Sequence, residues 1–558
     1  MRRLAALVLC LPLAAAAGNP PASAIASAHP LATEAGRQVL AQGGNAFDAA
    51  IAVAAVLGVV EPYSAGLGGG GFWLLHRADG QEIVVDARER APLAATPDMY
   101  LGDNGEPDPA ASLTGARAAA IPGQPAAFAH IAAQYGRLPL SASLAPAIAL
   151  AEDGFSVTPR YRSQAAMRLA DLTRDDRTAE IFLHEYDVPP LHHRIRQPAL
   201  ARTLSELAAK GADGFYRGET AERLVAAVRA AGGIWQRGDL RQYRVIERAP
   251  LKLDFGRMRL TTVPPPGGGL VVAETLALLD VPRWLKLASP QREQQLIEAM
   301  RLAYRDRAQY LGDPAFAKID VEQLLAPARI AALRREMPRG RAGVSAPLPR
   351  AGDGRDTTHL SVLDAEGNRV SATLSINGPF GAAFVAGETG VLLNNEMDDF
   401  VAKPGSPNLY GLVGSAANAI APGKRPQSSM SPSFIEDDGR VLIVGTPGGS
   451  RIISMLTQTA LAFAQGGAAI KTWLHQPRFH HQYLPDVVEH EPLALASVRK
   501  TLVARGYALK AVARPYGNMQ GVLWLKAGGR VLAASDPRGE GAAIVIPSDA
   551  PKRKRRAP

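Results

Sequence analysis

Two strand-like stretches that follow Thr357 constrain the fold of this 558-residue chain more than any other feature. Residues 358–363 and 369–376 alternate in strand fashion on either side of the turn DAEGN at 364–368. Alternation of period two around a short polar turn predicts an antiparallel hairpin. Thr357 therefore stands at the head of the first strand.

The sequence Asp356-Thr357-Thr358 places a hydroxyl at a point where the chain can be cut. Cleavage before Thr357 would give it an α-amino group with an ordinary pKa of about 7.7–8.0, and this amine can accept the hydroxyl proton. By itself the tripeptide also fits a turn or a helix N-cap. The Gly-, Pro- and Arg-rich stretch at 338–354 suits an exposed loop that can be cut.

Several motifs occur in order along nearly the whole chain. They are EAGRQVLAQGGNAFDAAIAVAAVLGVVEP, GLGGGGFWLL, VVDARERAP and PPPGGGL before Asp356, and DTTHLSVLDAEGNRVSATLSING, GVLLNNEMDDF, GSPNLYGLVG, KRPQSSMSP and GTPGGSR from there on. On these motifs the chain resembles the γ-glutamyltranspeptidases, a family of N-terminal nucleophile hydrolases. The resemblance implies a layered α/β fold, a four-layer αββα sandwich built from two chains after autocleavage.

The expected division of the chain follows from that cut. Residues 1–17 read as a secretory signal because two arginines precede an apolar run with small residues at its end. The run is shorter than the roughly 20 residues that a bilayer requires, so we expect an exported protein, periplasmic or secreted, without a membrane span in its mature form. The large chain would be 18–356 and the small chain 357–558, interlaced in one domain. Cys10, the only cysteine, lies in the signal, which leaves the mature protein without disulfides.

The positive charge of the chain does not indicate a nucleic-acid partner. The formal net charge is +10, but part of it comes from the basic run at 552–556. We expect residues 551–558 to form a disordered tail. No basic module with interleaved aromatic residues is present.

The resemblance implies donors that are γ-glutamyl amides such as glutathione, acceptors that are water, amino acids or dipeptides, and no cofactor or metal. It makes Thr357 the nucleophile and assigns to Thr358 and Ser375 hydroxyls that orient its amine. The backbone N–H groups of Gly448 and Gly449 would form the oxyanion hole.

The resemblance also assigns residues to the two charged ends of a glutamyl group. The α-ammonium would lie against Asn377, Glu396 and Asp399, because a cation leaving water needs opposite charge and acceptors. The neighbouring Asp398 leaves the choice of the closer carboxylate open. The α-carboxylate would be held by Arg88, with Arg90 as the alternative, together with Ser428 and Ser429. Tyr410 lies in the stretch 404–415, which resembles the lid loop of the family and would exclude water.

Other readings of the sequence remain in competition. An acylase of the same fold for glutaryl amides would need no counterpart to the α-ammonium. A non-catalytic exported binding protein would keep the fold and never mature. His359, His480 and His481 invite a metal or triad interpretation, but their spacing matches no zinc signature. The glycine run at 66–71 contains GxGxxG, but it follows a helical pattern at 33–60 and precedes a strand, the wrong order for a dinucleotide loop.

Overall fold

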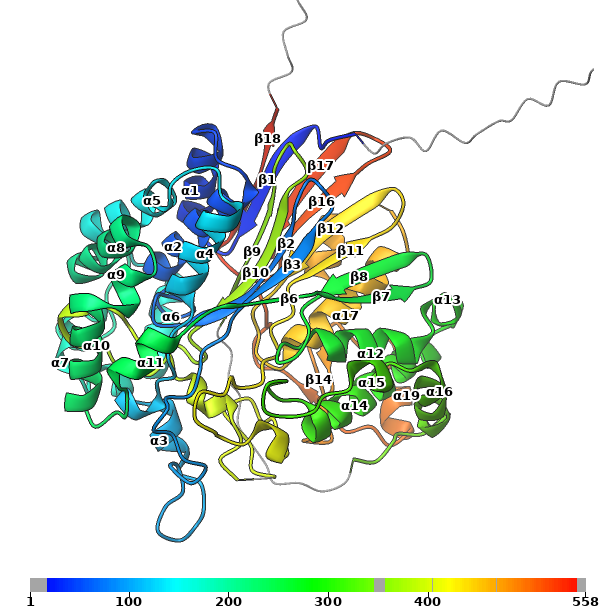
Figure 1. Ribbon diagram of the computed structural model, residues 1–558. Coiled ribbons are helices and arrows are strands. Elements are labelled where there is room, and N and C mark those ends of the chain that lie inside the picture. Colours follow the sequence, from blue (N-terminus) through cyan, green and yellow to red (C-terminus); the bar gives the residue numbers. More distant parts are fainter. Residues whose placement is uncertain (1–17, 346–356, 404, 468, 549–558) are drawn as a thin grey trace, which may run out of the picture.

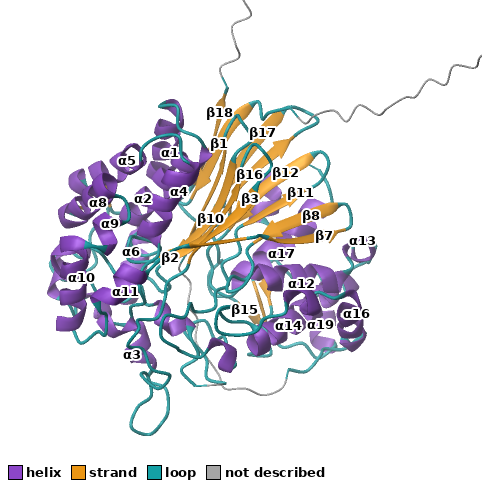
Figure 2. Cartoon of the chain, viewed as in Figure 1, coloured by secondary structure: helices purple, strands orange, loops and turns teal. Residues whose placement is uncertain are grey.

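The computed structural model of the chain describes residues 18–345, 357–403, 405–467 and 469–548. Two antiparallel sheets face each other, and helices cover the outer face of each sheet (Figure 1, Figure 2). The predicted αββα layering is therefore confirmed. The expected signal at 1–17, the first residue of the expected lid, Asp356 and the basic tail at 551–558 lie outside the described residues.

The first sheet has the hairpin that follows Thr357 near its centre. Its strands run in the order β18 (Ala542–Pro547), β1 (Ala22–Ser27), β9 (Thr358–Leu363), β10 (Arg369–Ser375), β2 (Gly70–His76), β3 (Glu82–Ala87) and β6 (Ile246–Arg248). All neighbouring strands are antiparallel. Strands from before and after Thr357 thus pair with one another within one sheet.

The second sheet is also antiparallel throughout. Its order is β17 (Arg530–Ser535), β16 (Gln520–Leu525), β12 (Arg440–Gly445), β11 (Ser433–Glu436), β8 (Met258–Thr262) and β7 (Leu251–Phe255). Two small sheets contain β13 (Phe479–His480), β14 (Val488–His490) and β15 (Leu509–Ala511), and β4 (Phe155–Ser156) and β5 (Arg194–Ile195).

Helices form the two outer layers (Figure 2). On the side of the first sheet they are α1 (Pro30–Ala41), α2 (Ala46–Val60), α4 (Gln124–Tyr135), α5 (Leu140–Asp153), α6 (Pro159–Leu172), α7 (Asp176–Phe182), α8 (Pro198–Lys210), α9 (Asp213–Tyr216), α10 (Gly218–Ala230) and α11 (Arg237–Gln242). On the side of the second sheet they are α12 (Gly269–Leu279), α13 (Val281–Trp284), α14 (Gln291–Tyr310), α15 (Val321–Leu324), α16 (Pro327–Glu336), α17 (Arg451–Ala464), α18 (Ile470–His475) and α19 (Arg499–Ala504). The short α3 (Pro109–Leu113) lies at the lower edge in Figure 1. Among these described segments, no helix combines the length and apolar character needed to cross a bilayer.

The two faces of the first sheet bury different side chains. In β2, Trp73 and Leu75 pack in the cluster that contains α2, whereas Phe72 and Leu74 pack in the cluster that contains Ile443 of the second sheet. Successive side chains of a strand point to opposite faces. Both faces are apolar because helices cover one and the second sheet covers the other.

The long helix expected over 33–60 is divided in two. Gly43 has a φ of 90°, and Asn45 and Asp48 form a capping box that begins α2. A glycine turn followed by a cap ends one helix and begins the next, although the apolar pattern continues through both. The expectation of one continuous helix was wrong at this break.

The hairpin predicted after Thr357 is confirmed as β9 and β10. Its register pairs Thr358 with Leu374. The carboxylate of Asp364 accepts hydrogen bonds from two backbone N–H groups of the turn, which fixes its shape. Because of this register, Ser375 at the end of β10 lies beside Thr357.

The glycine run at 66–71 leads into β2 and serves close backbone packing. A Cβ atom added to Gly69 would lie 2.1 Å from the carbonyl oxygen of Ser375. Only a residue without a side chain lets this segment pass the end of β10 so closely. The run therefore shapes the neighbourhood of Thr357 and does not open a helix.

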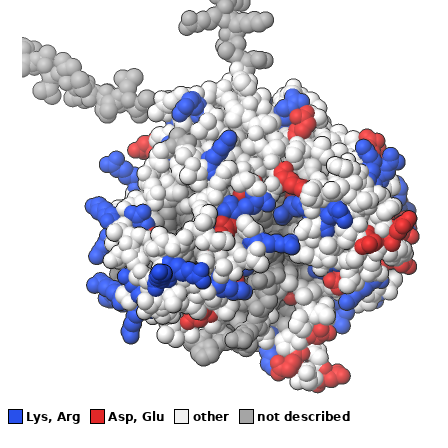
Figure 3. Space-filling view, turned by 180° about the vertical axis from the view of Figure 1, so that it is seen from behind, with Lys and Arg blue, Asp and Glu red and all other residues white. Residues whose placement is uncertain are grey.

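Basic side chains are spread over the face seen in Figure 3. They are interspersed with neutral surface and with acidic side chains, in line with the formal net charge of +10. This distribution resembles an ordinary solvated surface more than a stripe that tracks a nucleic-acid backbone.

Candidate active site

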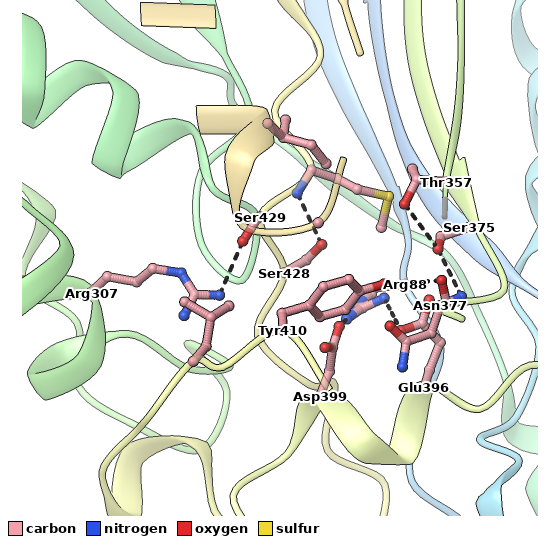
Figure 4. A pocket seen from close by; sticks show the side chains of 14 residues that line it. Arg88, Arg307, Thr357, Ser375, Asn377, Glu396, Asp399, Tyr410, Ser428 and Ser429 are labelled. Carbon is pink, nitrogen blue, oxygen red and sulfur yellow. Dashed lines mark hydrogen bonds and ion pairs between the residues drawn. The ribbon is translucent and has the colours of Figure 1, made fainter. Parts of the chain in front are cut away.

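A small pocket lies beside Thr357 at the end of β10 (Figure 4). Every residue that the sequence assigned to substrate binding lines it, namely Arg88, Asn377, Glu396, Asp399, Tyr410, Ser428 and Ser429. Thr357, Ser375 and Gly449 from the predicted catalytic set line it as well. The fold thus brings together side chains that lie more than 300 residues apart in the chain.

Thr357 is buried at the rim of the first sheet, with 4% of its surface exposed. Its Oγ1 lies 3.4 Å from Oγ of Ser375. Ser375 Oγ also accepts a hydrogen bond of 2.8 Å from the backbone N–H of Asn377. The hydroxyl of Thr357 therefore belongs to a fixed polar group that faces the pocket.

Arg88 holds the acidic side chains of the pocket in place. It follows β3, is 1% exposed, and forms ion pairs with Glu396 at 2.8 Å, with Glu89 at 3.2 Å and with Asp399. It also donates to the backbone carbonyls of 426–427. Burial raises the pKa of Glu396 well above its usual value, and the positive charge of Arg88 opposes this rise. The result is an anchored pair of acidic groups, of which Glu396 is buried and Asp399 is partly exposed.

The structure places Asp398 and Asp399 on different sides of their turn. Asp399 lines the pocket and pairs with Arg88. Asp398 accepts a hydrogen bond of 2.9 Å from the hydroxyl of Ser112 on α3 and one of 2.8 Å from the backbone N–H of Leu409. Asp399 is therefore the carboxylate of the pocket, and Asp398 joins α3 to the loop above it.

The loop at 405–415 covers the pocket through Tyr410. The Tyr410 hydroxyl donates to the backbone carbonyl of Asn377 at 3.0 Å, and its ring lies over the pocket in Figure 4. The side chain of Asn408 donates to Asp399 at 3.1 Å. Since the backbone N–H of Leu409 donates to Asp398, two consecutive residues of the loop bind the turn that contains Asp398 and Asp399. This arrangement suits a lid.

We expect Asp398 to make the stability of the protein depend on pH. Burial raises the pKa of Asp398 from 3.8 to about 7, although its hydrogen bonds act against the rise. Between these values the folded protein holds a proton that the unfolded chain has lost, so stability falls as pH rises through this window. Asp398→Asn has no such proton. Its free energy of unfolding should increase relative to the parent by up to about 4 kcal/mol between pH 4 and pH 8.

Urea unfolding of the parent and of Asp398→Asn at several pH values measures this difference. The free energy of unfolding of the parent is subtracted from that of the variant at each pH, so that the contributions of the other titrating groups cancel. A difference that stays constant over this range would contradict the prediction.

Three predicted or alternative residues lie away from the pocket. The hydroxyl of Thr358 donates to Glu61 at 2.9 Å, and Arg90 donates to the backbone carbonyl of Gly423 at 2.7 Å. Gly448 lines a neighbouring hollow on the other side of its turn. Arg90 is thus separated from the acidic pair, and the Thr358 side chain points away from the pocket that Thr357 lines.

The turn at Gly448 and Gly449 leads into α17. The two residues have φ values of 138° and 56°, where side chains other than glycine are strained. Their carbonyls accept hydrogen bonds from the backbone N–H groups of Arg451 and Ile452, so the turn is continuous with the helix. A helix N-terminus carries partial positive charge, which suits the vicinity of a developing oxyanion.

The three histidines noted in the sequence occupy structural positions. His359 lies between the sheets, 2.8 Å from Thr373, and burial lowers its pKa to about 3. Burial also lowers the pKa of His480 to about 3, and His481 pairs with Asp486. Within the ranges described above, no group of three or more His, Cys, Asp or Glu side chains has the arrangement of a metal site.

Four lining residues were not found from the sequence: Arg307, Leu412, Met430 and Ile452. Arg307 lies on α14, where charged residues are frequent and both buried ones, such as Glu298, and partly exposed ones, such as Arg305, occur. The apolar three form the nonpolar part of its lining. Nothing in a helical charge pattern distinguishes a buried arginine from its exposed neighbours.

The comparison with protein families identifies the chain. The model of the family described as gamma-glutamyltranspeptidase matches residues 32–546. The chain belongs to the γ-glutamyltranspeptidase family. The family, the fold class and the enzyme class predicted from the sequence are thereby confirmed.

Individual relatives cover most of this γ-glutamyltranspeptidase. The glutathione hydrolase proenzyme of Pseudomonas sp. (strain A14) is 41% identical over 480 residues, covering 85% of this chain and 84% of that protein. The glutathione hydrolase proenzyme of Escherichia coli (strain K12) is 38% identical over 524 residues, covering 92% and 90%. The crystal structure of a cephalosporin acylase from Bacillus halodurans superposes with a TM-score of 0.83 at 28% identity, covering 97% and 99%.

Proposed function

We propose that this γ-glutamyltranspeptidase cleaves γ-glutamyl amides such as glutathione and passes the glutamyl group to water, an amino acid or a dipeptide. The observation that carries the proposal is the pair Glu396 and Asp399, anchored by Arg88 in the pocket beside Thr357. A pair of acidic groups in a small pocket favours a ligand with a positive charge next to the reacting carbonyl. The α-ammonium of a glutamyl group supplies that charge.

Maturation is part of the proposal. The Thr357 hydroxyl attacks the carbonyl carbon of Asp356, the peptide C–N bond breaks, and the resulting ester is hydrolysed by water. The products are chains 18–356 and 357–558, roughly 36 and 21 kDa when 58.9 kDa is divided by residue count. Because β1, β2 and β3 share a sheet with β9 and β10, the two chains stay associated after the cut.

Catalysis then uses the new chain end. The Thr357 α-amine accepts the hydroxyl proton, the oxygen attacks the γ-carbonyl, and the backbone N–H groups of Gly448 and Gly449 stabilise the oxyanion. The amine product leaves with a proton, and water or an acceptor amine attacks the Thr357 ester. Ser375 is close enough to orient the hydroxyl, Asn377 positions Ser375 and the lid residue Tyr410, and the lid limits the access of water.

Export completes the proposal. The arginines and apolar run at 1–17 support transport across a membrane and removal of this segment, which places the mature enzyme in the periplasm or outside the cell.

The acylase alternative has a relative in its favour but lacks support from the pocket. An acylase ACY 1 proenzyme from Pseudomonas sp. (strain V22) is 34% identical over 534 residues. A glutaryl donor carries no α-ammonium, so it would place no positive charge against Glu396 and Asp399 beyond that of Arg88. The pocket therefore favours glutamyl over glutaryl donors.

Release of nitroaniline from γ-glutamyl-p-nitroanilide and glutaryl-p-nitroanilide tests this choice. The two donors differ only in the α-ammonium. We expect kcat/KM to be higher for the glutamyl donor by on the order of 10²–10³, since losing one charged partner of a largely desolvated contact costs several kcal/mol. Equal or faster cleavage of the glutaryl donor would favour the acylase.

A further inference from the structure

Gln482 lies between the lid and the proposed oxyanion turn at 448–449. Its Nε2 donates to the backbone carbonyl of Tyr410 at 3.2 Å and to that of Leu484 at 3.1 Å. Its Oε1 accepts a hydrogen bond of 2.6 Å from the hydroxyl of Ser450, the residue that directly follows the turn. One half-buried amide therefore contacts both the lid and the end of the oxyanion turn.

His480 fixes which end of the Gln482 amide faces the oxyanion turn. Burial lowers the pKa of His480 to about 3, so its ring is neutral and carries one N–H. Its Nδ1 lies 2.5 Å from the hydroxyl of Ser454, and its Nε2 lies 2.9 Å from Oε1 of Gln482. Because a hydroxyl can donate to Nδ1 and an amide oxygen can only accept, the N–H is on Nε2. The ring thus holds the amide oxygen toward Ser450 and leaves the amide N–H groups for the lid.

The loop that carries Gln482 has contacts of its own. Nδ1 of His481 accepts from the backbone N–H of Tyr483 at 3.1 Å, and Nε2 of His481 lies 3.1 Å from Asp486. Tyr483 has a φ of 68°, a conformation that residues other than glycine rarely adopt. Such backbone strain persists only where the surrounding structure enforces it. The position of the Gln482 side chain is therefore set by its own loop as well as by the lid.

Both groups that Gln482 joins are also held at a second point. The Tyr410 hydroxyl donates to the backbone carbonyl of Asn377, so the two ends of this lid residue have separate contacts. The backbone carbonyl of Ser450 accepts from the hydroxyl of Tyr304 on α14, a side chain that is 1% exposed. A shift of the lid would therefore displace Gln482, and through it Ser450.

We propose that Gln482 is a positioning residue that couples closure of the lid to the position of the oxyanion turn. The inference rests on the proposed function, in which this turn stabilises the oxyanion and the lid limits the access of water. A closed lid holds Tyr410 over the pocket, and through Gln482 the same state holds the turn beside the reacting carbonyl. Stabilisation of the oxyanion and exclusion of water then occur in one conformation.

The fate of the Thr357 ester reports on the lid. With γ-glutamyl-p-nitroanilide as donor and glycylglycine as acceptor, the ester gives glutamate with water and γ-glutamyl-glycylglycine with the acceptor. Both products come from one intermediate, so their ratio does not depend on the rate of acylation or on the fraction of mature enzyme. A dipeptide must be oriented for attack, whereas water needs only access. A loosened lid should therefore shift the ratio toward glutamate.

Two substitutions remove the two contacts of the Gln482 amide separately. In Gln482→Glu the carboxylate has the shape of the amide and still accepts from Ser450 and His480, but it donates no hydrogen bond to the carbonyl of Tyr410. Ser450→Ala removes the opposite contact and leaves the lid residues unchanged. We expect each variant to lower the ratio of transfer to hydrolysis by about threefold to tenfold, the usual effect of losing one hydrogen bond.

A double-mutant cycle tests whether Gln482 is the link. In Gln482→Leu, which lacks both contacts, the addition of Ser450→Ala should change the product ratio by less than about twofold. Hydrogen–deuterium exchange of the backbone amides at 405–415 gives a second, local measurement. Exchange there should be faster in Gln482→Glu and in Ser450→Ala than in the parent.

Gln476→Glu is the matched control. Gln476 is half-buried like Gln482, and its side chain donates to the backbone carbonyl of Trp473 in α18 at 2.9 Å. The same substitution there should leave both the product ratio and the exchange at 405–415 unchanged.

The outcomes separate the inference from the proposed function. If the parent cleaves the glutamyl donor but Ser450→Ala changes neither the ratio nor the exchange at 405–415, the inference is overturned. It is equally wrong if Gln482→Glu loses activity with both measurements unchanged, because its role is then structural. A parent that does not cleave the glutamyl donor contradicts the proposed function, and the exchange still shows whether the lid responds to Ser450. The exchange also decides if the parent forms only glutamate. Should Gln482→Glu fail to mature, Ser450→Ala decides by the same measurements.

Discussion

Thr357→Ala leaves the chain in one piece and without activity, if the cut before Thr357 creates the catalyst. The substitution removes the attacking oxygen of maturation and the nucleophile of catalysis at once. We expect a loss of at least about 10⁴ in kcat, as is common when a nucleophile is deleted. Denaturing electrophoresis should show one band for the variant and two bands for the parent, with Thr357 at the N-terminus of the smaller chain.

Thr357→Ser is the control for this experiment. It keeps the hydroxyl near Ser375 and should still be cut and remain active, though more slowly. Full activity from a parent protein that stays uncut would show that the amine of Thr357 is not the base. An uncut and inactive parent would instead favour the non-catalytic binding protein.

The hairpin was predictable because its determinants are local. Alternation along β9 and β10 and the polar turn between them set the register, and the register alone places Ser375 beside Thr357. Local signals also explain the error at α2. The positive φ of Gly43 and the cap at Asn45 end one helix and begin the next, although the apolar pattern continues over residues 33–60.

The rest of the site depends on contacts between distant elements. Arg88 was found because its motif resembles that of a known family. The structure adds the reason for its position, since β3 pairs with β2, which in turn pairs with β10 in the first sheet. Arg307 carries no such motif. Its side chain enters the pocket only because α14 packs over the second sheet, and single-sequence periodicity does not fix that packing.

Thr358 illustrates a limit of transferring roles by position. A hydroxyl next to the nucleophile in sequence was expected to orient the amine. Consecutive residues at the start of a strand point to opposite faces, so Thr358 turns toward Glu61 while Thr357 faces the pocket. Proximity in sequence therefore predicts separation of these two side chains.

Gly448→Ala is expected to lower kcat by on the order of 10²–10³ by displacing the turn that donates to the oxyanion. The φ of Gly448 is 138°, a conformation that alanine avoids, and its added Cβ would lie 2.7 Å from Cε of Met455. The Met455 side chain can move, but the backbone strain remains. The peptide between Gly448 and Gly449 must then rotate, and its N–H group leaves the reacting carbonyl.

Gly466→Ala separates this catalytic effect from a general loss of stability. Gly466 has a φ of 95° with nothing within 4 Å of an added Cβ, so alanine there is strained in a similar way but disturbs no neighbour. Both variants should unfold at lower denaturant concentrations, with a loss on the order of 1–3 kcal/mol. Only Gly448→Ala should lose kcat, with KM for the glutamyl donor little changed, because an oxyanion donor acts in the transition state. Equal kcat in the two variants would mean that the turn before α17 contributes to packing but does not stabilise the oxyanion. The oxyanion would then be stabilised by donors on another wall of the pocket.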